Sequence, residues 1–194
     1  DIPMKGFKHL LYIANEGEHL ENITRHLLEI FTTLIPSKKV MLMDVDDEYD
    51  GQFNLFARIS ETETLEDMAN QLMLELEDRK KGETGHDFII FIPNLEKFVQ
   101  ASGLTGEQVS ALYQEGWKYN MHFVVGSSYS YISNNAIGSP ARQIKAYNQH
   151  YLLGMRLTDQ TILEKPYNSK EPYLIKDEVY LYGRPSSVKL KITI

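Results

Sequence analysis

Five short apolar runs alternate along the chain with longer segments in which apolar residues recur at helical spacing. This alternation is typical of βαβ units, in which the strands pair in parallel and the helices cover the sheet. The strands are predicted at residues 9–14, 39–45, 87–93, 121–127 and 150–157. We therefore expect an α/β domain with a mainly parallel central sheet flanked by helices.

Capping residues mark where several helices begin. Thr64 precedes an apolar helical face and is expected to cap it. Thr105 opens a capping box, and Ser139-Pro140 fits the N-cap and first position of another helix. Near the end of the chain, apolar runs at residues 179–182 and 188–194 flank a turn that contains glycine and proline. A β-hairpin is therefore expected to close the sheet.

The composition is that of a globular protein of ordinary size. At 194 residues, 42% hydrophobic and 24% charged, the chain is expected to form one domain over residues 1–194, and its apolar runs are too short to cross a bilayer. The absence of cysteine excludes disulfides, and the net charge of −7 disfavours nucleic acid as a partner. Because the sequence begins at Asp1 without Met or a signal-like segment, we expect it to be part of a larger protein.

The turn after the first strand stands where a phosphate-binding loop lies in many βαβ proteins. The pattern G-x-x-x-x-G-K-[ST] uses glycines for backbone contacts to phosphate, Lys to neutralise charge and Ser or Thr to hold Mg²⁺. Counted from the strand end, its four fixed positions fall on Ala14, His19, Leu20 and Glu21. None of them matches, and Gly17 is the one glycine in the turn. The segment keeps the strand-loop-helix frame without the phosphate chemistry.

Two further features disfavour a bound nucleotide. Glu16, Glu18 and Glu21 surround the expected place of the triphosphate, and like charges about 4 Å apart repel by about 4 kcal/mol at an effective dielectric of about 20. The apolar strand 88–92 is followed by Pro93-Asn94, where a Walker B strand ends in acidic residues that serve Mg²⁺ and the attacking water. We therefore predict no catalytic residue, no metal, and no ATP or Mg²⁺ cofactor in this chain.

Further segments make the chain similar to a known family. They are residues 95–98, 122–128, 151–159 and 182–185. Together with the degenerate loop and Pro93-Asn94, they resemble a C-terminal ATPase module of the FtsK/SpoIIIE type, and within that group the last domain of the EssC/EccC motor of type VII secretion systems. The glycine-arginine-glycine of that family is represented by Gly183-Arg184, with Pro185 in the third position.

The resemblance implies a RecA-like P-loop NTPase fold. It also implies that the chain is one of several tandem modules in the cytoplasmic part of a cell-membrane protein. It implies other ATPase domains of the same motor and exported helical-hairpin proteins as partners, with a homo-hexamer as the assembly of the full motor. Because the phosphate positions are lost, the chain is predicted to be catalytically silent and to serve substrate recognition and motor assembly. The alternatives are an ATPase completed by residues from neighbouring modules and a regulatory module of a DNA translocase.

The acidic run after the second strand opens a third alternative. Asp44 and Asp46 at a strand end have the spacing of a metal-dependent phosphohydrolase, in which one Asp attacks phosphorus and the other acts as acid and base. That chemistry needs another acid at a neighbouring strand end, where this chain has Pro93-Asn94. As a calcium loop, the run places Ala57 where a Glu ligand is needed. A solvated acidic loop is the favoured interpretation.

The remaining histidines and aromatic residues give no stronger signal. The six histidines are scattered, without a pair at metal-ligand spacing, so no metal site is predicted. Tyr113 and Trp117 lie in the predicted helix 105–120, where packing in the core is the favoured role. A groove for a partner helix is the alternative for the same face.

Overall fold

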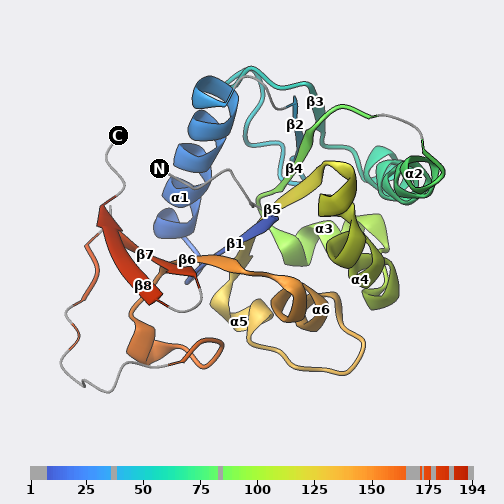
Figure 1. Cartoon of the computed structure of the whole chain (residues 1–194). Coiled ribbons are helices and arrows are strands. Elements are labelled where there is room, and N and C mark those ends of the chain that lie inside the picture. Colours follow the sequence, from blue (N-terminus) through green and yellow to red (C-terminus); the bar gives the residue numbers. More distant parts are fainter. Residues whose placement is uncertain are drawn as a thin grey trace.

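The computed structural model describes residues 8–35, 39–82, 85–164, 171, 173–175 and 178–183, and the backbone of residues 186–191. Within these ranges, eight strands form one sheet in the order β3-β2-β4-β5-β1-β6-β7-β8 (Figure 1). The strands are β1 (His9–Ala14), β2 (Lys39–Met43), β3 (Ala57–Ile59), β4 (Phe88–Ile92), β5 (Met121–Ser128), β6 (His150–Gly154), β7 (Glu178–Gly183) and β8 (Ser186–Lys191).

The sheet is parallel over most of its width. β1 lies between β5 and β6, and all pairings from β3 across to β6 are parallel. β7 pairs antiparallel with β6, and β8 pairs antiparallel with β7. The predicted mainly parallel sheet and its closing hairpin are therefore confirmed, apart from residues 192–194 of the predicted hairpin, which lie outside the described residues.

Helices follow most of the parallel strands. They are α1 (Glu18–Glu29), continued by the π-helical turn η1 (Ile30–Leu34), α2 (Thr62–Lys80), α3 (Leu95–Ser102), α4 (Gly106–Glu115), continued by the 3₁₀ turn η2 (Gly116–Tyr119), α5 (Tyr129–Ile132), α6 (Pro140–Tyr147) and the 3₁₀ turn η3 (Leu157–Asp159). The capping box at Thr105 and the N-cap at Ser139 are confirmed. The predicted cap at Thr64 is wrong: α2 begins at Thr62, and the Thr64 hydroxyl donates to the carbonyl of Glu61 instead.

Two apolar layers cover the two faces of the sheet, because successive residues of a strand point to opposite faces. Leu10 and Tyr12 of β1 pack with α1 on one face. Leu11 and Ile13 of the same strand pack with residues of α2, α3, α4 and α6 on the other. Figure 1 shows the long helix α1 on one side of the sheet, and α3, α4 and α6 on the other side.

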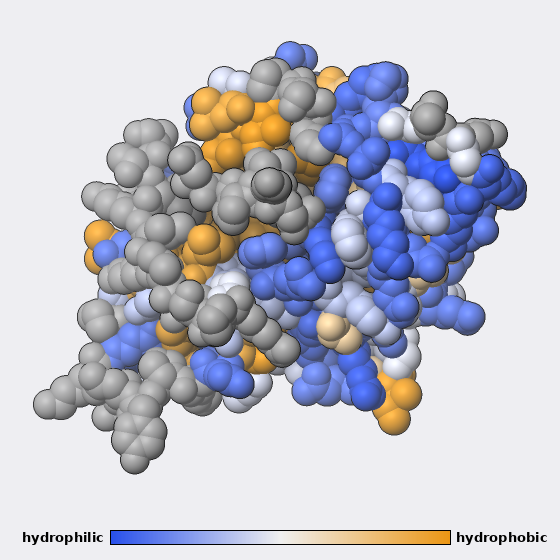
Figure 2. Space-filling view, in the orientation of Figure 1, coloured by the Kyte–Doolittle hydropathy of each residue, from blue (hydrophilic) through white to orange (hydrophobic). Residues whose placement is uncertain are grey.

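The outward faces of the helices are polar, as their amphipathic patterns predict. In Figure 2, hydrophilic side chains cover most of the region over α2, α3 and α4, whereas a hydrophobic group lies near the C-terminal end of α1. Leu34, in the turn that continues α1, is one exposed apolar residue of the chain. Among the helices in the described ranges, none has the length and apolar character needed to span a membrane.

Two strands end two or three residues earlier than predicted, the predicted bounds of β4 and β5 are off by one residue, and β3 was not predicted. β2 ends at Met43 rather than residue 45, because the Asp44 side chain folds back onto the following loop. β6 ends at Gly154 rather than residue 157, because Leu157 already belongs to the 3₁₀ turn η3. β3 has only three residues, too few for an alternating pattern to be visible in the sequence.

Candidate functional site

A cavity of about 430 Å³ opens at the carboxyl ends of the parallel strands. Its wall is formed by residues that follow four neighbouring strands: Glu16 and Gly17 after β1, Asp46 and Glu48 after β2, Pro93 and Asn94 after β4, and Ser128 at the end of β5. Open α/β sheets bind their ligands in this crevice, where the strand order reverses. The cavity is therefore the first place to look for a function.

The structure brings most of the predicted loop positions to this cavity. Gly17, Leu20, Glu21, Pro93 and Asn94 line it. Ala14 and His19 do not appear in its wall: Ala14 is buried at the end of β1, and His19 turns toward β6. A Cβ added at Gly154 of β6 would lie 2.9 Å from Ala14 Cβ and 3.3 Å from His19 Nε2. These two side chains therefore close the turn against β6 instead of facing a ligand.

The connection between β1 and α1 is short. Only residues 15–17 separate the strand from the helix, whereas the phosphate-loop pattern places four residues between its two glycines. Gly17, with φ of 110°, is the N-cap of α1 and has no side chain to cap it. Its carbonyl accepts the backbone N–H of Leu20 at 3.0 Å and that of Glu21 at 3.3 Å. Two of the N–H groups that would face a phosphate are thus used within the helix itself.

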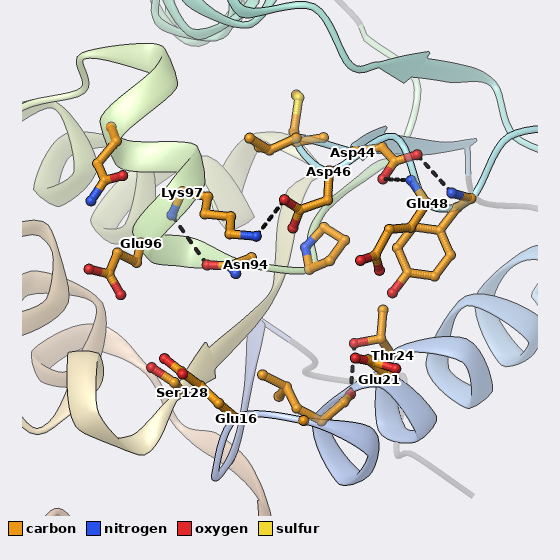
Figure 3. A pocket seen from close by; sticks show the side chains of 17 residues that line it. Glu16, Glu21, Thr24, Asp44, Asp46, Glu48, Asn94, Glu96, Lys97 and Ser128 are labelled. Carbon is orange, nitrogen blue, oxygen red and sulfur yellow. Dashed lines mark hydrogen bonds and ion pairs between the residues drawn. The ribbon is translucent and has the colours of Figure 1, made fainter.

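Carboxylates dominate the charge of the cavity. Among the residues that the structure describes, the acidic ones in this wall are Glu16, Glu21, Asp44, Asp46, Glu48 and Glu96, and the one cation is Lys97. Figure 3 shows Lys97 reaching across to Asp46, while Glu16 and Glu21 lie on the opposite side, near the start of α1. The hydrogen bond that Lys97 donates to Asp46 raises the pKa of Lys97.

The pKa of Glu48 is affected by the negative charge of the cavity. Burial raises the pKa of Glu48, and the nearby carboxylates of Asp46 and Glu21 raise it further. Like charges disfavour the ionised form of a carboxyl group. The field that acts on Glu48 would also act on the phosphate groups of a nucleotide.

Asp44 has a structural role. Its side chain is 1% exposed, and its carboxylate accepts the backbone N–H groups of Glu48 and Tyr49, each at 3.0 Å. Arg58 Nε of β3 donates to the same carboxylate at 2.9 Å. The carboxylate that would attack phosphorus in a phosphohydrolase is thus occupied by the loop, and the residues that the structure describes contain no group of three His, Asp or Glu placed to hold a metal ion.

The end of β4 has also taken a structural role. Asn94 is the N-cap of α3, and its side-chain oxygen accepts the backbone N–H of Lys97 at 3.2 Å. An Asn at an N-cap satisfies one of the free N–H groups at the start of a helix. The position of a Walker B acid is therefore held by a capping residue.

Sequence reasoning missed a polar chain below the cavity and some of its wall. Tyr12 Oη lies 2.9 Å from Thr24 Oγ1, and Thr24 donates to the carbonyl of Leu20 at 2.9 Å. Tyr12 is buried in a strand that reads as uniformly apolar, so its partner could not be named from sequence. Lys97 was part of the resemblance, but its pairing with Asp46 spans 51 positions and leaves no local signal.

Comparison with known proteins connects this geometry to one group of ATPases. No family model matches the chain. The type VII secretion system protein EssC of Staphylococcus aureus (strain MRSA252) is 24% identical over 185 residues, which cover 91% of this chain and 12% of that protein. The chain thus spans about an eighth of the length of this curated relative.

Several solved structures share the fold. EssC (ATPases 2 and 3) from Geobacillus thermodenitrificans superposes with a TM-score of 0.73 at 14% identity, over 98% of this chain and 38% of that one. Thermomonospora curvata EccC (ATPases 2 and 3) in complex with a signal sequence peptide gives 0.66 at 14% identity, over 96% and 36%. The pCW3 conjugation coupling protein TcpA with ATPγS gives 0.67 at 15% identity, over 95% and 59%.

These likenesses establish the class of fold and confirm the resemblance found in the sequence. The chain has the RecA-like fold of P-loop ATPases, with a mainly parallel sheet and a C-terminal antiparallel hairpin. It is similar to one ATPase module of the EssC and EccC secretion motors.

Proposed function

We propose that this chain is a nucleotide-free ATPase-like module of a type VII secretion motor, which contributes substrate recognition and motor assembly instead of hydrolysis. The observation that carries the proposal is the cavity at the nucleotide position, whose wall holds six carboxylates and one paired lysine. The similarity to EssC and EccC supports a place in the secretion motor, and the acidic cavity supports a role other than ATP hydrolysis.

The residues of the cavity do not fit a magnesium nucleotide. Leu20 stands where the phosphate-binding Lys is required, Glu21 where Ser or Thr holds Mg²⁺, and Asn94 caps a helix at the Walker B position. A triphosphate would meet Glu16, Glu21 and Glu48, while Lys97 is already paired with Asp46. Each pair of like charges about 4 Å apart costs about 4 kcal/mol at an effective dielectric of about 20. These features support a site that excludes nucleotide.

The relatives support a position for this module within a larger protein. One solved neighbour is described as the cytoplasmic domain of EssC, and others as ATPases 2 and 3 of EssC or EccC. We infer that the chain is one of several tandem modules in the cytoplasmic part of a membrane protein, with the other modules as partners and a hexamer as the working assembly. The neighbour solved with a signal sequence peptide supports exported proteins as the substrates to be recognised.

Deletion of residues 1–194 from the parent motor tests the proposed role. We expect export to be lost while ATP hydrolysis per motor persists, because the module supplies recognition and no power. A matched control changes Glu16 and Glu21 to Gln in the intact parent and should leave both activities unchanged, since no nucleotide is handled at this cavity. The proposal fails if the deletion leaves export intact, or if the control variant loses hydrolysis.

A further inference from the structure

A second cavity, of about 650 Å³, lies at the other end of the parallel strands, where these strands begin. Its wall includes Lys8 just before β1, His150 at the start of β6 and Gly183 at the end of β7. The turn η2 after α4 contributes Trp117, and the end of α6 contributes Tyr147. Its volume is that of a pocket for a small ligand or a few side chains.

The charge of this cavity is opposite to that of the chain as a whole. Lys8, Lys118 and Lys145 line it, and Glu115, the one acidic residue in the described part of its wall, is paired with Lys80 outside the cavity. Burial lowers the pKa of Lys145, and the nearby Arg142 lowers it further. A chain of net charge −7 thus carries a concave surface with a local excess of positive charge.

Aromatic rings and two unpartnered polar atoms complete the wall. The Lys8 ammonium lies 4.0 Å from the centre of the Trp117 ring. Tyr113 is 3% exposed and Asn148 is 8% exposed, and within the described part of the chain neither Tyr113 Oη nor Asn148 Oδ1 has a hydrogen-bond partner. Both atoms are buried behind the surface of the cavity, so they add polar character to its floor.

A smaller cavity of about 320 Å³ continues this surface along α6. The two cavities share Lys145, Ala146 and Tyr151, and the smaller one adds Arg142 together with Glu164. We call the two neighbouring cavities the basic trough; among the described residues, its wall holds four cations (Lys8, Lys118, Arg142 and Lys145) and two acidic residues (Glu115 and Glu164).

We propose that the basic trough binds a short acidic peptide segment, with its carboxylates beside Lys8 and Lys118 and an aromatic side chain against Trp117. The Lys145 ammonium donates to the Asn134 carbonyl at 3.0 Å and to Asn135 Oδ1 at 2.6 Å, and it adds to the positive charge of the wall. Charge complementarity favours an acidic partner, and the ring of Trp117 favours one that also carries aromatic side chains. A nucleic acid is disfavoured because the cations are few and the chain carries a net charge of −7. The inference gives a location to the proposed recognition role and rests on it for its biological meaning.

The chain offers a direct optical probe of this site, because Trp117 is its single tryptophan. We expect the acetylated peptide (Glu-Tyr)₄ to change Trp117 fluorescence in a saturable way, and this binding to weaken several-fold between about 50 and 500 mM salt. The uncharged peptide (Gln-Tyr)₄ serves as the matched control and should bind at least about tenfold more weakly. Equal binding of both peptides, or no saturable change with (Glu-Tyr)₄, overturns the proposal.

Substitutions locate the binding. Lys118→Gln together with Lys8→Gln should weaken (Glu-Tyr)₄ about tenfold, since two partly exposed ion pairs are lost. Lys118→Gln alone covers the case in which the double variant does not fold, and should weaken binding about threefold. Lys81→Gln, at a lysine that is 71% exposed at the end of α2, is the control and should bind as the unchanged chain does. Equal losses in the control and the trough variants would contradict the proposal.

Competing ligands complete the test. Oligo(dT) of twelve nucleotides and phosphatidylglycerol vesicles should leave Trp117 fluorescence unchanged. A saturable response to one of them, with no response to the peptide, would overturn the peptide proposal in favour of that ligand. Nucleotide binding by the same chain would overturn the proposed function and leave a positive peptide result standing. The two failures are therefore distinguishable.

Discussion

We expect the free energy of unfolding to fall by an amount of the order of 4 kcal/mol between pH 6.5 and pH 3 through His9 alone. Burial lowers the pKa of His9 from the usual 6.5 to about 3, against a smaller opposite effect of its hydrogen bond to the Tyr113 carbonyl. A histidine whose folded-state pKa is lowered binds its proton in the unfolded chain first. Its contribution is thus fully present above pH 6.5 and is lost as the pH falls toward the folded pKa.

The hydrogen bonds of His9 explain why the charged form is excluded. His9 Nδ1 accepts the backbone N–H of Phe123 at 3.0 Å, so the ring proton lies on Nε2 and is donated to the Tyr113 carbonyl at 2.9 Å. A second proton on Nδ1 would remove the acceptor for Phe123 and place a charge among aromatic rings.

Urea titrations at a series of pH values measure this effect. His9→Gln should show a smaller stability loss between pH 6.5 and pH 3, whatever its stability at neutral pH. His86→Gln, at an exposed histidine, is the control and should keep the pH dependence of the unchanged chain. A His9→Gln variant with an unaltered pH slope would contradict the assignment.

Replacing Asp44 by Ala should cost about 3 kcal/mol of unfolding free energy, which is the second large effect that we expect. The change removes the acceptor of two backbone N–H groups and of Arg58 Nε, and leaves these donors without their partner at the buried base of the loop. Chemical denaturation at neutral pH gives the difference directly.

Asp50 provides the matched control for this substitution. It also pairs with Arg58, but its side chain is 82% exposed, so Asp50→Ala should cost less than about 1 kcal/mol. Equal losses for the two variants would show that the Asp44 carboxylate does not hold the loop, and would return it to consideration as a chemical group.

The sequence predicts the fold in its strongly patterned parts. The apolar runs around Leu11, Ile90 and Val124 belong to buried central strands, whose composition is distinct because both faces are covered. The capping box at Thr105 and the Ser139-Pro140 start are local signals that the structure keeps. Thr64 is not the cap because α2 begins earlier, at Thr62, with Glu61 as its N-cap. No residue ahead of Thr64 prevents the helix from starting there.

The missing nucleotide-binding residues of the candidate site could be predicted from the sequence, but the side-chain contacts that take their place could not. Leu20, Glu21 and Pro93-Asn94 depart from known patterns at known positions, so the missing chemistry is visible in the sequence. The turn of His19 toward Gly154 and the pairing of Lys97 with Asp46 depend on strands far apart in the chain. The basic trough combines Lys8, Trp117 and Lys145 from three separate segments, and no spacing in the sequence connects them.

Calorimetric titration of the 194-residue chain with ATP and Mg²⁺ tests the central claim most directly. The acidic cavity and the short turn at Gly17 predict no saturable binding at nucleotide concentrations up to about 1 mM, which corresponds to an affinity weaker than about −4 kcal/mol. A dissociation constant near 1 μM, about −8 kcal/mol, would contradict the account, because it would require a phosphate site among these carboxylates.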